Sequence, residues 1–408
     1  MAPNPVNAEA STTATALAVA VLAGVPVLLW GPPGTGKSSV VRDLAAAIDR
    51  PCEVVIASIR EPSDFAGLPI VHDGGVRFAP PSWATNLAEA GRGILFLDEI
   101  STAPPAVQAA LLRVVLERTV GDLRLPEPVA VVAAANPPEQ AADGWDLSAP
   151  LANRFCHLDW STDAATVAGG FTAGFGPAVG SDLLDRLRAT DADADVDDAD
   201  ADADADGGAD VDDPDADDGG ATDSVVGDGI RSRTRAEIAT FLLLRPSTVV
   251  APPVERAAAG RAWPSPRTWE MAADLLAAAR SIDVAPEVRT ALVCGCVGQG
   301  PGIEFLGWLA ELDLPDPEVV LADPAAFQLP ERGDRAYAAL MSVAAAVAAR
   351  ATSERWAAGW EVLGRAGEQV PDVAAMAART LVRCRPDGAA TPPQAAVFLP
   401  LLRDAGLA

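Results

Sequence analysis

The sequence contains few of the residues that build metal centres or disulfide frameworks. Its 408 residues include two histidines and five cysteines, and no two cysteines form a Cys-x-x-Cys pair. The cysteines are odd in number and scattered, at Cys52, Cys156, Cys294, Cys296 and Cys384. Zinc sites and disulfide-stabilised domains need clustered or evenly paired ligands, so neither is expected here. We interpret these cysteines as buried thiols.

Membrane-spanning segments and secretion signals are also missing. The longest apolar run, Ala16 to Trp30, is interrupted by Gly24 and Pro26 and is shorter than the roughly 20 residues that cross a bilayer. The first residues, Met1-Ala2-Pro3-Asn4-Pro5, lack the basic start of a secretion signal. We therefore expect no membrane insertion and a cytoplasmic location.

Positive charge is scarce, and lysine is almost absent. Thirty basic residues stand against 57 acidic ones, which gives a net charge of −27 at pH 7, and Lys37 is the only lysine. Seventeen aspartates lie between Asp191 and Asp228 without a Lys, Arg or Glu, which leaves a net charge of −10 on the rest of the chain. This balance disfavours non-specific binding to nucleic acids and anionic membranes, although it is compatible with a local basic groove.

The first 160 residues alternate short apolar runs with helical stretches. Half of the chain is hydrophobic and 21% is charged, so a sizeable core can form. Continuous apolar strands separated by helices indicate a parallel sheet covered on both faces, which is the α/β class. The predicted strands are Val25–Trp30, Cys52–Ala57, Gly93–Leu97, Val129–Ala135 and Phe155–Trp160, and the predicted helices are Lys37–Asp49, Trp83–Gly91 and Pro105–Glu117.

Two glycine-containing turns interrupt this alternation, and an acidic repeat ends it. The turns within Pro69–Ala79 and Thr119–Leu125 predict two hairpins inserted into the scaffold. The Asp-Ala repeat from Asp191 to about Gly229 has almost no large apolar residue, so we expect a disordered linker. An acidic tether for a basic partner, or mimicry of nucleic acid, is the functional alternative. The chain after Arg231 has the pattern of consecutive helices.

Residues 31–38 carry the strongest chemical signal. Their order, Gly31-Pro32-Pro33-Gly34-Thr35-Gly36-Lys37-Ser38, fits the phosphate-binding loop, with an apolar strand before it and a helix after it. Backbone N–H groups of such a loop surround phosphates, the lysine reaches the β- and γ-phosphates, and the Ser38 hydroxyl can ligate Mg²⁺. We predict that these residues and Ser39 bind the nucleotide. A chance match in a non-binding loop is the alternative, and the strand and helix around the motif disfavour it. The position of the only lysine, where a compact ammonium suits the loop, adds support.

A second motif follows the strand Ile94-Leu95-Phe96-Leu97, which ends in Asp98 and Glu99. An apolar strand that ends in two acids has the form of a Walker B site, in which Asp98 would hold the Mg²⁺ shell and Glu99 would orient and deprotonate water. Adjacent acids are also common in surface turns. Their combination with a phosphate-binding loop favours the catalytic interpretation and implies hydrolysis of a nucleoside triphosphate.

A third buried strand, Val131 to Ala135, ends in Asn136 and Pro137. The Asn136 amide could hydrogen-bond the attacking water or the γ-phosphate. Asparagine also starts turns before proline, and the sequence alone favours both interpretations equally.

The order of these motifs resembles the AAA+ ATPases, and within them the MoxR and dynein-related branch. The segments that carry the resemblance are Gly31–Ser38, Leu97-Asp98-Glu99, Ala135-Asn136-Pro137, Leu151-Ala152-Asn153-Arg154-Phe155 and Ser265-Pro266-Arg267-Thr268-Trp269. The insertion Glu61–Pro69 and the hairpin Thr119–Pro128 also match that branch. The resemblance implies a P-loop NTPase domain at 1–189 and a helical lid at 230–312, followed by a C-terminal helical region at 313–408. The acidic linker at 190–229 lies between the domain and the lid and is longer than the family requires.

The same resemblance implies roles for two arginines. Arg154 corresponds to the arginine finger, whose charge would stabilise the phosphoryl group transferred in the neighbouring subunit. Arg267 corresponds to sensor 2 on the lid, which touches the nucleotide of its own subunit. Arg154 could instead cap a turn before the last strand, and Pro266-Arg267 could simply start a helix.

The resemblance implies a Mg²⁺-dependent ATPase that forms a ring, most simply a hexamer, and remodels or matures a protein partner with a von Willebrand factor A domain. One alternative is a scaffold that switches conformation with ATP and turns over little. Another is a nucleic-acid motor, which the net charge of −27 disfavours.

Overall fold

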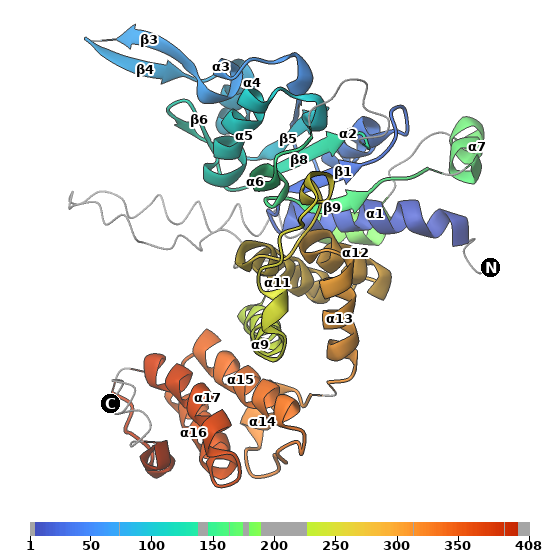
Figure 1. Ribbon diagram of the computed structural model, residues 1–408. Helices are drawn as coiled ribbons and strands as arrows, with labels where there is room; N and C mark the ends of the chain where they lie inside the picture. Colours follow the sequence, from blue (N-terminus) through green and yellow to red (C-terminus); the bar gives the residue numbers. More distant parts are fainter. Residues whose placement is uncertain are drawn as a thin grey trace. The chain divides into compact units, whose positions relative to one another are not determined.

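A five-stranded parallel sheet forms the centre of the first of two folded units (Figure 1). The computed structural model describes residues 5–72, 74–137, 146–162, 164–173, 179–188, 227–312, 314–386 and 388–398. The strand order is β2-β5-β8-β1-β9, and all neighbouring strands are parallel. The strands are β1 (Val27–Trp30), β2 (Cys52–Ile56), β5 (Gly93–Asp98), β8 (Val129–Ala135) and β9 (Cys156–Asp159). The predicted α/β class and its five strands are confirmed.

Helices cover both faces of the sheet, which is why the inner strands β1 and β8 are apolar at every position. All seven residues of β8 are buried. Alternate side chains point to opposite faces, so β8 must be covered on both sides. Helices α1 (Pro5–Leu22) and α2 (Lys37–Ala47) contact β8, α1 also contacts β1 and β9, and α2 also contacts β5. Helices α4 (Ser82–Ala90), α5 (Pro105–Glu117) and α6 (Ala149–Ala152) contribute Trp83, Leu111 and Leu151 to a core shared with the sheet.

The two predicted hairpins are present, and backbone contacts join them. They consist of β3 (Leu68–His72) with β4 (Gly75–Ala79) and of β6 (Thr119–Val120) with β7 (Leu123–Arg124); α3 (Ser63–Ala66) precedes the first. Asp122 N donates to Phe78 O at 3.0 Å, and Phe78 N donates to Asp122 Oδ2 at 2.9 Å. Gly121 has φ 62°, and a Cβ there would lie 2.4 Å from Phe78 O. The longer hairpin, which projects beyond the rest of its unit in Figure 1, is thus anchored at its base by the shorter one.

Two helices of the first unit pack on the edge strand β9 or on its neighbours. Helix α12 (Pro286–Val297) contacts β9, α11 (Pro266–Ser281) and α1. Its Gly295 permits a close approach, because a Cβ there would lie 2.5 Å from the carbonyl oxygen of His157. Helix α12 therefore covers a strand that, among the described strands, pairs with β1 alone, and it shields an edge that could otherwise pair with another chain. The unit also contains α7 (Ala164–Ala173), a helix at 181–188 and α10 (Arg256–Ala259).

The second unit is helical. Its helices are α9 (Asp228–Leu244), most of α13 (Gln299–Ala310), α14 (Pro317–Ala322), α15 (Gly333–Ala349), α16 (Ser353–Gly367) and α17 (Pro371–Arg383). Trp356, Trp360 and Phe398 are buried in its core, where the Trp356 and Trp360 ring centroids are 5.9 Å apart. These aromatic residues pack as core residues, in agreement with their helical spacing in the sequence.

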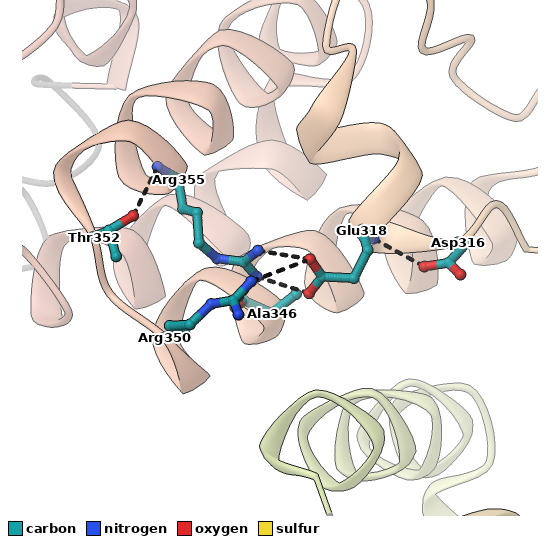
Figure 2. A network of polar contacts seen from close by, with 6 residues as sticks. All are labelled: Asp316, Glu318, Ala346, Arg350, Thr352 and Arg355. Atoms are coloured by element: carbon teal, nitrogen blue, oxygen red, sulfur yellow. Dashed lines mark hydrogen bonds and ion pairs between the residues drawn. The ribbon is translucent and has the colours of Figure 1, made fainter.

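One ion-pair network holds three helices of the second unit together (Figure 2). The Arg355 guanidinium donates to both carboxylate oxygens of Glu318, at 2.6 and 2.8 Å, and to the carbonyl oxygen of Ala346 at 2.7 Å. Arg350 approaches the same carboxylate at 3.8 Å. These hydrogen bonds lower the pKa of Glu318 and raise the pKa of Arg355. The bidentate geometry ties α14 to α16 and to the end of α15.

The division into units differs from the predicted parts. Helix α9 packs along α15 and belongs to the second unit, whereas α10, α11 and α12 belong to the first, so the predicted lid at 230–312 is divided between them. The predicted linker at 190–229 lies outside the described residues up to residue 226. No helix in the described part of the chain combines the length and the apolar character that crossing a membrane requires.

The contact at Gly295 leads to a stability prediction. We expect Gly295→Ala to lower the free energy of unfolding by about 1–3 kcal/mol, because overpacking would push α12 away from β9. Gly300→Ala is a matched control, since no atom lies within 4 Å of its added Cβ. Thermal unfolding followed by circular dichroism measures both. Equal melting temperatures for Gly295→Ala and wild type would contradict the close contact.

Candidate nucleotide-binding site

The parallel strands bring the predicted site residues to one edge of the sheet. The loop 31–36 follows β1, Asp98 ends β5, and Asn136 follows β8. Strand β1 pairs with β8 and β9 so that Trp30 lies opposite Ala135 and Asp159. The carboxyl ends of parallel strands form a common crevice, which is where α/β proteins bind ligands.

The phosphate-binding loop is held in a fixed conformation. Gly34 and Gly36 have φ values of 76° and 89°, in the left-handed region that favours glycine. The Thr35 hydroxyl donates to Pro32 O at 2.8 Å, and the Trp160 indole donates to Thr35 O at 2.9 Å. The loop ends at the first residue of α2, so free N–H groups of a helix N-terminus lie beside it.

Lys37 is buried, and three oxygen atoms hold its ammonium group. Its Nζ donates to Gly31 O at 2.6 Å, to Pro32 O at 2.9 Å and to Asn136 Oδ1 at 3.0 Å. Burial lowers the pKa of Lys37, and the charge of Asp98 opposes this effect. The structure thus brings Asn136 to the lysine that would reach the terminal phosphates. Among the other predicted binding residues, Pro33 and Ser39 are exposed beside the loop.

Ser38 and Asp98 form a pair that suits a magnesium ion. The Ser38 hydroxyl donates to Asp98 Oδ2 at 2.8 Å. Mg²⁺ prefers oxygen ligands and is usually held by one or two protein groups together with phosphate oxygens and water. In the described residues no group of three or more His, Cys, Asp or Glu side chains is arranged to hold a metal, so this pair would need the phosphates to complete the ion's shell.

Glu99 is oriented by its backbone and by a residue that the sequence did not single out. Its φ of 57° and ψ of 38° are left-handed, a conformation that costs a residue with a Cβ roughly 1–2 kcal/mol. The Ser58 hydroxyl donates to Glu99 Oε2 at 2.5 Å. Ser58 lies in the short helix η1 (Ala57–Ile59) between β2 and the insertion with the longer hairpin. The sequence signal that could have identified Ser58 is its position directly after the predicted strand Cys52–Ala57.

The segments that carry Arg154 and Arg267 are in contact through Asn153. The Arg154 guanidinium donates to Pro150 O, and its Nε is buried without a hydrogen-bond partner. Burial lowers the pKa of Arg154, and the charge of Arg267 lowers it further. Asn153 connects the two segments, because its amide donates to Trp263 O at 3.2 Å and accepts from the Ser265 hydroxyl at 2.8 Å.

The two arginines make different contacts from the groups around the phosphate-binding loop. In the part of the chain that the structure describes, neither guanidinium hydrogen-bonds or ion-pairs with the loop, Asp98 or Glu99. Ser265 also caps α11 through the backbone N–H of Thr268, so the N-terminus of α11 fixes the place of Arg267. Arg267 therefore lies at the start of α11, and the residues just before this helix contact Asn153, the residue before Arg154.

A buried histidine lies between the loop and Arg154. The Trp30 indole donates to His157 Nδ1 at 2.8 Å, and His157 Nε2 lies 2.9 Å from Ala152 O. Arg261 lies 4.1 Å from the Trp30 ring centroid and pairs with Asp159 at 3.0 Å. Burial lowers the pKa of His157 to about 4; the hydrogen bond to Ala152 and the charge of Asp159 oppose this shift, and the charge of Arg261 adds to it.

A cavity of about 1000 Å³ opens beside this group. Thr13, Asp159, Arg261, Glu287 and Gln299 are among the residues that line it. Its lining includes Asp159, and the next residue, Trp160, hydrogen-bonds Thr35 of the phosphate-binding loop. Sequence analysis did not predict it, since its walls come from α1, β9, α12 and the loop before α11.

The comparison with protein families identifies this domain. Residues 26–155 match the family model described as "AAA domain (dynein-related subfamily)". These residues therefore form an AAA domain of that subfamily, within a chain whose sheet and P-loop have the corresponding α/β fold. The predicted resemblance to AAA+ ATPases of the dynein-related branch is confirmed.

Individual relatives resemble only parts of the chain or only its fold. The probable regulatory protein WtsA of the Pantoea stewartii subsp. stewartii pathogenicity locus is 35% identical over 121 residues, which are 28% of this chain and 38% of that protein. A candidate ATPase from Cytophaga hutchinsonii covers 70% of this chain and 80% of its own, with 18% identity and a TM-score of 0.38. A full-length MCM homolog from Methanopyrus kandleri covers 73% and 63%, with 17% identity and a TM-score of 0.34. At these scores the structural likeness carries no functional conclusion.

The contacts of Lys37 predict that arginine cannot replace it. We expect Lys37→Arg to weaken nucleotide binding roughly tenfold or more, because a planar guanidinium does not fit among three oxygens that hold one ammonium. Titration with a fluorescent ATP analogue measures the affinity. The reverse exchange Arg42→Lys, at an exposed position of α2, is the control and should leave the affinity unchanged. Wild-type affinity in Lys37→Arg would contradict the proposed place of the ammonium.

The low pKa of His157 predicts a loss of stability in acid. The unfolded chain takes up this proton near pH 6.5, but the folded chain takes it up only near pH 4, so stability from this group falls as the pH decreases between these values. From pH 7 to pH 5 the loss attributable to His157 is about 2 kcal/mol. Urea unfolding of wild type and of His157→Asn at both pH values measures it. A pH dependence that is identical in the two proteins would contradict the shift.

Proposed function

We propose that the chain is a Mg²⁺-dependent ATPase that assembles into a ring, most simply a hexamer, and uses hydrolysis to remodel a protein partner. The observation that carries the proposal is the cluster at the carboxyl edge of the sheet, where Lys37 bonds Asn136, and Ser38 bonds Asp98, the residue before Glu99. A second group, Arg154 and Arg267, makes no hydrogen bond or ion pair with this cluster among the described residues. A complete site for phosphoryl transfer would combine the first group of one subunit with the pair of the next.

In this proposal the phosphate-binding loop and Lys37 bind the β- and γ-phosphates. The Ser38 hydroxyl and the Asp98 carboxylate would hold Mg²⁺, which supplies charge neutralisation at the phosphate oxygens. Glu99 accepts the proton of the attacking water, and the Asn136 amide orients that water or the γ-phosphate. The Ser58 hydroxyl bonds the Glu99 carboxylate, so this bond must loosen or shift when Glu99 turns to the water.

The large cavity beside Trp30 can receive the nucleoside. Its volume of about 1000 Å³ lies within the range of small-molecule sites, and its lining includes Asp159, next to the tryptophan that bonds the loop. The pair of arginines serves the neighbouring subunit. The resemblance implies that Arg267 acts on its own nucleotide, but the contact of its segment with Asn153 favours action together with Arg154.

The remodelling role and a partner with a von Willebrand factor A domain rest on the resemblance to the MoxR branch. The exposed side chains of the longer hairpin are compatible with contact to a protein: Leu68, Val71, Val76 and Phe78 are between 43% and 85% exposed. Exposed apolar surface of this kind is typical of interaction sites.

Catalysis across a subunit boundary predicts that hydrolysis depends on assembly. We expect turnover per subunit to rise with protein concentration and to fall at least about 100-fold in Glu99→Gln and in Arg154→Ala, because both groups act in the transition state. Phosphate release at concentrations from dilute to tens of micromolar measures this. Arg113→Ala, which removes a surface arginine paired only with Glu117 at i+4, is the matched control. Turnover that is independent of concentration, or that survives Arg154→Ala, would contradict the ring ATPase.

A further inference from the structure

His157 provides a direct route from the phosphate-binding loop to the segment that carries Arg154. Its ring accepts a hydrogen bond from Trp30, the residue directly before Gly31, and lies 2.9 Å from the carbonyl oxygen of Ala152, two residues before Arg154. Trp30 is 4% and His157 8% exposed, so neither bond competes with bulk water. One side chain thus touches the strand that ends in the loop and the helix α6 that leads to the arginine.

The two contacts fix the chemical form of the ring. Because the Trp30 N–H can only donate, His157 Nδ1 must be unprotonated, and Nε2 must carry the hydrogen that Ala152 O accepts. Protonation at Nδ1 would place two hydrogens against each other and break the bond to Trp30. A neutral imidazole supplies an acceptor on one side and a donor on the other, across a rigid ring.

Side chains around Trp30 and His157 also hold these two residues and the phosphate-binding loop in place. Two charged groups face His157. Arg261 lies over the Trp30 ring, and it pairs with the second group, Asp159. Trp160 bonds the loop at Thr35, and the backbone of Gly31 lies against Trp160, where a Cβ would be 2.4 Å from its carbonyl oxygen. Strand β9 is therefore attached to the phosphate-binding loop at its end and, through His157, at the start of the loop.

Other functions for this histidine do not fit its surroundings. It is buried beneath Trp30, and its two nitrogens are both in use, so it has no open position for a substrate proton. No metal-binding group of His, Cys, Asp and Glu occurs among the described residues around it. What the ring can do is transmit position between the two segments that it joins.

We propose that His157 is a positioning residue for Arg154, which sets the arginine presented to the next subunit according to the state of the phosphate-binding loop in its own subunit. The proposal rests on the proposed ring ATPase. Nucleotide in the loop displaces or fixes Trp30, His157 passes this displacement to Ala152 O, and α6 carries it to Arg154. An arginine that is misplaced by about 1 Å would lose much of its effect on the transition state.

Two substitutions of His157 test its hydrogen bonds to Trp30 and to Ala152 separately. In His157→Asn the amide oxygen can still accept from Trp30, but the side chain is too short to reach Ala152 O. In His157→Gln the amide nitrogen reaches the Nε2 position and can donate to Ala152 O. We expect His157→Asn to lower kcat roughly tenfold with nucleotide affinity within about twofold of wild type, and His157→Gln to retain most of kcat.

Mixed rings test whether the effect acts on the neighbour. Glu99→Gln subunits do not hydrolyse ATP but still present their Arg154, so they are mixed in equal amounts with wild type. The same mixture is made with Glu99→Gln/His157→Asn, with Glu99→Gln/His157→Gln and, as the reference for a lost arginine, with Glu99→Gln/Arg154→Ala. We expect the His157→Asn mixture to turn over about as slowly as the Arg154→Ala mixture, and the His157→Gln mixture to match Glu99→Gln alone.

The outcomes distinguish this inference from the proposed function. If the His157→Asn mixture turns over as fast as the Glu99→Gln mixture while the Arg154→Ala mixture is slow, His157 has only a structural role and the inference is overturned. If Arg154→Ala in the mixture has no effect, the ring ATPase itself fails. Size-exclusion chromatography and binding of a fluorescent ATP analogue check folding and assembly. Should His157→Asn not assemble, Trp30→Phe in the Glu99→Gln background breaks the other bond and must give the same slow mixture.

Discussion

The site depends on the position of one short strand. Strand β1 has four buried residues and pairs on both sides, with β8 through Trp30 and Ala135 and with β9 through Trp30 and Asp159. Parallel pairing with a fixed register places the residues that follow each strand at one level. This is how Gly31, Asn136 and Trp160 come together around the loop without any contact between them along the sequence. A shift of β1 by one residue would turn its side chains to the opposite face and separate Lys37 from Asn136.

Most of the fold and the motif residues could be predicted because their signals are local. The apolar strands, the two hairpins and the phosphate-binding loop are each written in a continuous stretch, and the structure has the strands and hairpins where the sequence places them. Helix α1 was not predicted. Its residues are mostly small and apolar, so neither a helical stripe nor a capping residue distinguishes it from a long apolar run.

The remaining parts of the site could not be predicted, because they depend on contacts between distant segments. Ser58 and Glu99 are 41 residues apart, Trp30 and His157 are 127 apart, and Asn153 and Ser265 are 112 apart. No periodicity relates such pairs, and each residue alone has an ordinary structural explanation. The predicted lid was divided for the same reason, since only packing shows that α9 belongs with α15 and not with α11.

Arg154 and Arg267 have no evident stabilising role within a single subunit. Two like charges repel, and burial adds a desolvation cost, as the lowered pKa of Arg154 shows. The chain has 57 acidic residues, yet in the described part of it neither Arg154 nor Arg267 forms an ion pair with a carboxylate. One nearby Asp or Glu would be enough to remove this electrostatic cost. The two arginines are understandable if an anion from outside the subunit neutralises them, and the triphosphate bound by a neighbouring copy has the charge to do so. Under the same proposal, the Arg154 guanidinium, which hydrogen-bonds Pro150 O, would be positioned further through the contact of His157 with Ala152 O.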